Sequence, residues 1–146
     1  MWRLPKRDEI DKYATINKVE SLLEEYPRLC RVAGVKVQQS LTANYNSVAV
    51  SHSTTNTNEE SIINAIGARK EIQDIDYALS LLNDTNRKIL EYKYKYGYGD
   101  RFAYSRLAIS ESTYYRYLIK AKIEFAEAYC NGVLLVKDGA RGIGGI

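Results

Sequence analysis

The chain has 146 residues, a net charge of +3, 45% hydrophobic residues and 27% charged residues. This length supports one core with a small appendage rather than two large domains, and the composition excludes a chain that is disordered throughout. No apolar run approaches the roughly 20 residues of a membrane span, and the start MWRLPKRDEI lacks a signal peptide's apolar core. We therefore expect a cytoplasmic protein with no membrane partner.

Cysteine and histidine usage argues against metal sites and catalysis. Cys30 and Cys130 form no CxxC pair, and His52 is the single histidine. This pattern supports neither a disulfide framework nor a zinc site, and we expect both thiols to be buried. The carboxylates Glu71, Asp74 and Asp76 fit the solvated face of a helix better than acid-base chemistry. We expect no cofactor, no metal and no enzymatic activity.

The N-terminal third is predicted to hold one helical segment, within residues 1–34. Thr15 is the predicted N-cap, Gly34 ends the helix, and Pro27 kinks or divides it. The apolar residues that recur at helical spacing are Val19, Leu22, Leu23, Tyr26 and Leu29.

Residues 35–58 are rich in Ser, Thr and Asn, which compete with regular backbone pairing. We interpret this stretch as a polar linker. The alternation around Val48 and Val50 leaves a short strand as the alternative.

Helical periodicity resumes at Glu59 and continues to about Leu82. The apolar stripe consists of Ile62, Ile66, Ile72, Ile75, Leu79 and Leu82. From Ile72 onward the spacing approximates a heptad seam, so this helix either pairs with a second copy or packs against its own chain, and the second interpretation is favoured.

A third helix is predicted from a cap at Asp84 toward Tyr96, and the break at 97–100 separates it from the next. With short connections and no comparable strand pattern, residues 59–132 are predicted to form a four-helix module. The fold class is thus all-α. The glycine-rich stretch 133–146 lacks the strand and helix that flank a phosphate-binding loop, and we expect a flexible tail.

Residues 100–130 have the pattern of a DNA-binding helix-turn-helix: a short helix, a four-residue turn and a second, basic helix. Leu107 and Ile109 provide an apolar pair at the turn, and Ser110 is suited to cap the second helix. Ala108 occupies the usual glycine position, and Tyr104 stands where many such motifs have a small residue.

Helical phasing divides the second helix into two faces. Tyr114, Leu118, Ala121 and Phe125 fall on the inner face. The residues predicted to face DNA are Ser110, Glu111, Ser112, Thr113, Tyr115, Arg116, Ile119 and Lys120. Arg116 and Tyr115 are predicted to contact a guanine edge and a thymine methyl group, and Ser112 and Thr113 to contact either bases or phosphates. Glu111 either contacts a cytosine amino group or interacts with the helix dipole. The residues predicted to contact phosphates are Lys120, Lys122, Arg101 and Arg106. An ordinary helical hairpin with a polar outer face is the alternative.

Several short sequence motifs resemble those of the ArpU family of phage transcriptional regulators. They are TINKVESLLEEY at 15–26, IDYALSLL at 75–82, RKILEYKY at 87–94, ISESTYYR at 109–116 and KAKIEFAEAY at 120–129. The second half also resembles in layout the promoter-reading last domain of bacterial housekeeping sigma factors. The resemblance implies a regulator of phage or prophage late genes, with a name historically linked to autolysin control.

Two functions follow as hypotheses. The first is a sequence-specific regulator, expected to be an activator, that binds double-stranded DNA in the bacterial host and self-associates through 59–82 or the N-terminal helix. The second is a protein-interaction module that contacts host RNA polymerase or a packaging component without reading DNA.

Overall fold

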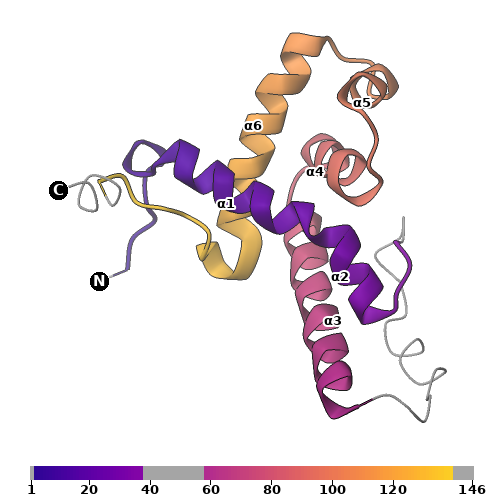
Figure 1. Cartoon of the computed structure of the whole chain (residues 1–146). Helices are drawn as coiled ribbons and strands as arrows, with labels where there is room; N and C mark the ends of the chain where they lie inside the picture. The colour runs from indigo at the N-terminus through magenta and orange to yellow at the C-terminus, as the bar shows by residue number, and fades with distance from the viewer. Residues whose placement is uncertain (1, 38–57, 140–146) are drawn as a thin grey trace.

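The computed structural model describes residues 2–37 and 58–139, which form an all-α structure, as predicted (Figure 1). The main helices are α1 (Lys12–Glu24), α2 (Tyr26–Ala33), α3 (Glu59–Ser80), α4 (Asp84–Leu90), α5 (Asp100–Arg106) and α6 (Glu111–Ala128). Short 3-10 turns cover Arg7–Glu9 and Tyr129–Gly132, and a π-helix covers Glu91–Lys95. In this part of the chain, no helix is long and apolar enough to cross a bilayer.

The N-terminal segment begins and divides at residues with clear physical reasons. Asp11, not Thr15, caps α1, because the Asp11 carboxylate accepts a hydrogen bond from the Ala14 amide at 3.1 Å. The predicted cap at Thr15 is wrong, and its buried hydroxyl instead accepts from the Val136 amide. Pro27 lies in the first turn of α2, and Gly34 ends that helix with a φ of 73°.

The long helix α3 packs against its own chain over its second half. Ile72, Ile75 and Leu79 are buried in the common core, which confirms the favoured interpretation of the stripe. The first turns differ, because Ile62 and Ile66 are exposed there. Most of the predicted linker, including the alternative strand, lies outside the described residues.

Helix α4 is capped by Asn83, whose side chain accepts from the Asn86 amide at 2.9 Å, so the predicted cap at Asp84 is displaced by one residue. The π-helix that follows turns Tyr94 and Lys95 into the interior. Lys95 forms a buried salt bridge with Asp76 of α3 at 3.1 Å, and the Tyr26 hydroxyl of α2 donates to the same carboxylate at 3.1 Å. The prediction that Asp76 lies on the solvated face of its helix is therefore wrong. This polar contact connects three elements.

One hydrophobic core includes residues from both halves of the chain. Val19 and Leu23 of α1 and Cys30 of α2 belong to the same buried cluster as Tyr114 and Phe125 of α6. α1 crosses α6, and α2 lies against α3 (Figure 1). The helices predicted as a separate N-terminal segment therefore pack on the predicted C-terminal module.

The end of the described chain differs from the expected flexible tail. The Asp11 amide donates to the Val136 carbonyl at 2.8 Å, and the Asp138 amide donates to the Glu9 carbonyl at 2.7 Å. Of the two cysteines, Cys30 is buried as predicted, but Cys130 is exposed, so that prediction is wrong. Cys130 follows the end of α6 with a φ of 46°, outside helical geometry.

Candidate nucleic-acid interface

The connection between α5 and α6 is a tight turn at residues 107–110. Ala108 has a φ of 57°, the left-handed conformation that explains why glycine is common at this position. The Ala108 and Ile109 amides donate to the Ser105 and Tyr104 carbonyls, each at 3.1 Å, and so close the end of α5. Leu107 and Ile109 are half-buried against the core.

Ser110 caps α6 as predicted. Its hydroxyl oxygen accepts from the Thr113 amide at 3.2 Å and lies 2.9 Å from the Thr113 hydroxyl. The acidic Glu111 occupies the first turn, where a carboxylate interacts favourably with the positive end of the helix dipole. The start of α6 is therefore well defined although it projects from the molecule (Figure 1).

Asp100 fixes α5 against α6. The Asp100 carboxylate accepts from the Tyr114 hydroxyl at 2.6 Å and the Tyr115 hydroxyl at 3.3 Å, and it pairs with Lys93 at 3.0 Å. Burial alone would raise the pKa of this carboxyl, but hydrogen bonds from Tyr114, Lys93 and Tyr115 outweigh it and lower the pKa below its ordinary value. Burial, followed by the Asp100 hydrogen bond, raises the pKa of Tyr114. Both groups are thus held in their hydrogen-bonding forms.

Tyr104 finds room beside Tyr114. Their ring centroids lie 5.7 Å apart, with the planes tilted by 58°, a favourable aromatic geometry. The large side chain at this usually small position is half-buried and packs between the two helices. It therefore contributes to the contact between α5 and α6.

The inner and outer faces of α6 follow the predicted phasing in the first half of the helix. Tyr114, Leu118, Ala121 and Phe125 are all buried. We define the α6 surface by the residues Ser110, Glu111, Ser112, Thr113, Tyr115, Arg116, Ile119 and Lys120, all of them exposed except the half-buried Thr113.

Arg116 is the most constrained cation of the α6 surface. Its guanidinium donates to the Thr113 hydroxyl at 3.3 Å and lies 5.9 Å from the centre of the Tyr117 ring. Lys120 is one helical turn further along. Both cations are presented to solvent from a rigid helix.

Lys122 does not belong to this surface. It is only 5% exposed, and its ammonium pairs with Glu20 of α1. The interpretation of Lys122 as a phosphate contact is therefore corrected, because α1 covers the second half of α6 where the sequence alone predicts solvent. The exposed face predicted to contact DNA therefore ends near Lys120.

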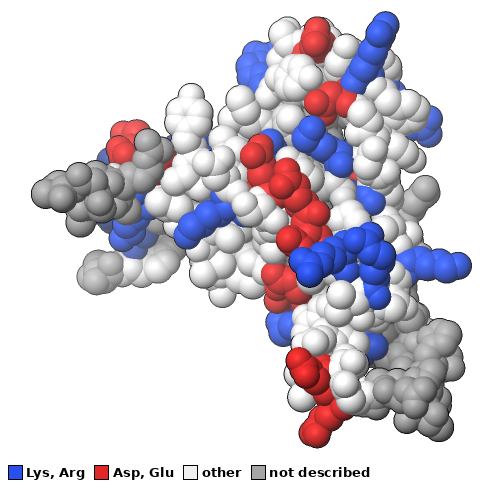
Figure 2. All heavy atoms as spheres, in the orientation of Figure 1, with Lys and Arg blue, Asp and Glu red and all other residues white. Residues whose placement is uncertain are grey.

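Arg101 and Arg106 are exposed on α5, next to the α6 surface. In the face shown in Figure 2, acidic side chains form a band over the middle of the molecule, where α1 lies. At the end formed by α5 and the start of α6, Lys and Arg side chains project beside smaller acidic patches. The predicted DNA-contacting end is thus separated from the main acidic band.

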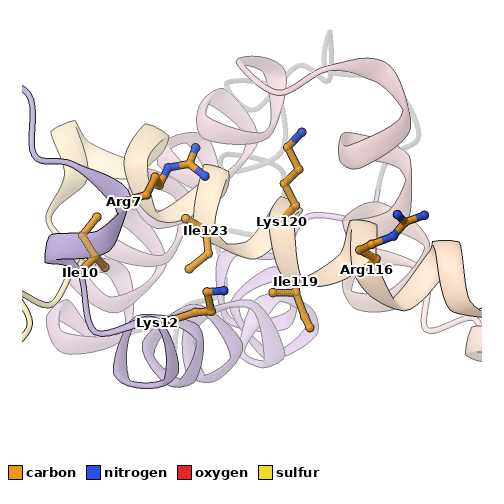
Figure 3. Close-up of a pocket in the computed structure, with 7 residues that line it drawn as sticks. All are labelled: Arg7, Ile10, Lys12, Arg116, Ile119, Lys120 and Ile123. Atoms are coloured by element: carbon orange, nitrogen blue, oxygen red, sulfur yellow. The ribbon is translucent and has the colours of Figure 1, made fainter.

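A groove of about 370 Å³ lies between α6 and the N-terminal segment (Figure 3). It is lined by Arg7, Ile10, Lys12, Arg116, Ile119, Lys120 and Ile123. Arg7 is held by two hydrogen bonds to Glu127, from Nε at 2.6 Å and from Nη2 at 2.9 Å. Sequence reasoning did not find Arg7, Ile10 or Lys12, because no local pattern places them beside a helix that is about a hundred residues away.

Among the described residues, no group of acidic, histidine and cysteine side chains has the arrangement of a metal site. His52 lies outside these residues. The described side chains of α5, α6 and the N-terminal segment offer hydrogen bonds and positive charge at the interface.

Comparison with known proteins gives one informative relative. No family model and no solved structure matches the chain. The chain is 31% identical over 133 residues to the "Putative autolysin regulatory protein ArpU" of Streptococcus phage O1205, a match that covers 88% of this chain and 96% of that protein. Since the similarity extends over nearly the whole of both sequences, this chain belongs to the ArpU family of phage proteins.

Proposed function

We propose that this protein is a sequence-specific DNA-binding transcription regulator, an activator of phage or prophage late genes, that places the first turns of α6 in the major groove. The observation that carries the proposal is the α6 surface itself, which is polar and basic and is not covered by residues 2–37 or 58–139. It is presented by a capped helix that follows a tight turn. The regulatory name of the relative supports the same class of function.

The dimensions and chemistry of α6 suit major-groove recognition. The exposed stretch from Ser110 to Lys120 is about 15 Å long at the helical rise, and a B-DNA major groove admits one helix. Arg116 can donate a bidentate pair to a guanine edge, and Ser112 and Thr113 can bond to bases or phosphates. The exposed ring of Tyr115 is available to a thymine methyl group, while its hydroxyl remains on Asp100.

Arg101, Arg106 and Lys120 are assigned to phosphates, which contribute affinity without sequence information. None of these three forms a salt bridge within residues 2–37 and 58–139. Their full positive charge is therefore available to a polyanion. Ser110 and Glu111 complete the start of the reading helix.

Self-association is part of the proposal, because one reading helix makes few base contacts and a dimer doubles them. Apolar side chains are exposed on the first turns of α3: Ile62 at 48%, Ile63 at 60% and Ile66 at 56%. A second copy that packs on this surface would bury them. Sedimentation velocity should show a dimer, Ile66→Asp should shift it to monomer, and Tyr13→Asp, at an exposed aromatic site on α1, should not.

The DNA-binding test is a fluorescence anisotropy titration with fragments of a phage late promoter. Arg116→Ala should cost about 1–3 kcal/mol on the specific site and weaken discrimination between sites. Lys120→Ala should weaken all sequences similarly and reduce the slope of log K against log salt by about 1. Arg28→Ala, an exposed arginine on α2, is the matched control. Unchanged affinity and slope in both α6 variants would exclude this surface.

An interaction with host RNA polymerase is the second candidate. The observation that favours it is an aromatic cluster at the start of α5, in which Phe102 is 49% exposed and its ring lies 4.7 Å from that of Tyr98. Phe102 also lines a groove together with Lys88 and Arg106. Retention on immobilised polymerase that Phe102→Ala abolishes, without DNA binding at low salt, would favour this function over DNA reading.

A further inference from the structure

We propose that the groove between α6 and the N-terminal segment holds the sugar-phosphate backbone of the bound DNA, with Arg7 and Lys12 as phosphate contacts. This inference rests on the proposed function and extends the interface to a second element of the chain. Arg7, Ile10 and Lys12 lie on one side of the groove, and four residues of α6 form the other (Figure 3).

The composition of the groove matches a phosphodiester chain. Four of its lining side chains are cationic, Arg7, Lys12, Arg116 and Lys120, and none is acidic. The other three are isoleucines: Ile10 and Ile123 are buried, and Ile119 is 45% exposed and offers an apolar surface to the carbon face of a deoxyribose ring. Nucleic-acid backbone combines anionic phosphates with apolar sugar faces, and charge complementarity therefore favours this occupant.

The position of the groove favours the same occupant. Arg116 and Lys120 belong both to the groove and to the α6 surface. A duplex that receives the first turns of α6 in its major groove must bring one flanking strand past these residues, since the two strands border the groove. Arg7 and Lys12 then lie beyond α6 on the side of that strand.

Lys12 supplies an independent argument from stability. It is the first residue of α1, where the positive end of the helix dipole disfavours a cation. No salt bridge to Lys12 is formed within the described parts of the chain. The charge of Lys12 is thus unfavourable for folding, and its side chain is exposed beside a basic groove. These properties fit a ligand contact better than a structural role.

Arg7 is also oriented to contact a phosphate. Glu127 engages its Nε and Nη2 atoms, and Nη1 takes no part in this pair. The carboxylate fixes the guanidinium at the edge of the groove, and the Nη1 donors remain for a phosphate oxygen. Because Glu127 partly neutralises it, Arg7 offers a phosphate less positive charge than Lys12 does. Its position is better defined, because the same carboxylate holds the guanidinium.

The test is anisotropy titration of the full chain over a salt series, with a duplex of about 30 base pairs, roughly three helical turns. Each phosphate contact adds about 0.9 to the slope of log K against log salt. Lys12→Gln should lower the slope by about 1, and the double variant Arg7→Gln/Lys12→Gln should lower it further, by up to about 2, because Glu127 partly neutralises Arg7. Lys18→Gln, another exposed lysine of α1 that does not line the groove, should leave the slope unchanged.

Thermal unfolding of the same variants separates a ligand contact from a structural one. Lys12→Gln should melt at the same or a higher temperature while it binds DNA more weakly. If Arg116→Ala weakens binding but Lys12→Gln and Arg7→Gln keep the wild-type slope, the groove proposal is overturned and the proposed function stands. If the wild-type chain binds no duplex at low salt, both are overturned.

Discussion

Replacing Lys95 with Met should strongly destabilise the protein, because it removes one partner of a buried ion pair. The side chains of Lys95 and Asp76 are only 3% and 8% exposed, and their charged atoms lie 3.1 Å apart. The Lys95 ammonium also lies 5.2 Å from the centre of the Tyr26 ring. Without Lys95, the Asp76 carboxylate loses its counter-charge in the interior, and such a loss costs about 3–5 kcal/mol.

Urea denaturation followed by circular dichroism measures this effect. With a urea slope of about 1–3 kcal/mol per molar, the midpoint should fall by at least about 1 M. A useful comparison is Lys88→Met, since the Lys88 side chain is 43% exposed and its pair with Asp84 spans 3.3 Å. Exposed pairs of this kind contribute about 0.2–1 kcal/mol, so this control should unfold near the wild-type midpoint.

The double variant Lys95→Met/Asp76→Leu tests the reasoning further. Removal of both charges leaves no unpaired buried ion, and the double variant should be more stable than Lys95→Met alone. The Tyr26 hydroxyl loses an acceptor, which limits the recovery by about 1–3 kcal/mol. A loss below about 1 kcal/mol in Lys95→Met, or strictly additive effects in the double variant, would refute the interpretation.

Three further changes test the interface scaffold. Ala108→Gly should raise stability by a few tenths to about 1 kcal/mol, because relief of the left-handed strain exceeds the entropy that glycine adds to the unfolded chain, and thermal melting should show a small increase. Ser110→Ala should cost about 1 kcal/mol through loss of the cap on α6, measured by urea denaturation. Because the pKa of Asp100 is lowered in the folded protein, the ionised carboxylate stabilises the fold at pH values above its unfolded pKa of about 3.9. This stabilisation is lost as the pH falls through the folded pKa. Asp100→Asn should therefore flatten the acidic part of a plot of melting temperature against pH, and an unaltered plot would contradict the assignment.

The local features of the fold could be predicted from the sequence because they depend on neighbours in the chain. The inner row of α6, from Tyr114 to Phe125, follows from the helical period alone, and the end of α2 at Gly34 follows from glycine's tolerance of a left-handed φ. Cap positions are less certain, since Asp11 and Thr15 are both good caps within one turn. Thr15 is buried rather than a cap, and its hydroxyl accepts a hydrogen bond from the amide of Val136, which is far along the chain. A pattern within one helix does not reveal such a contact.

The parts that sequence reasoning missed all depend on contacts between distant segments. Lys122 lies between the two faces of α6, and its burial is decided by Glu20, which is 102 residues earlier. The contribution of Arg7 and Lys12 to the groove has the same origin. Periodicity within one helix carries no information about which other helix will cover it, so the extent of the candidate interface was predicted on α6 and not on the N-terminal segment.

The geometry of the groove depends on the backbone hydrogen bonds that join Glu9 and Asp11 to residues 136–138. None of these C-terminal residues lines the groove, yet they hold the backbone on either side of Ile10, between Arg7 and Lys12. A chain shortened to end before Val136 would keep every cation of the interface but would lose the backbone hydrogen bonds that position Arg7 and Lys12. Its DNA affinity should then resemble that of the double variant Arg7→Gln/Lys12→Gln, although no cation that lines the groove has been removed.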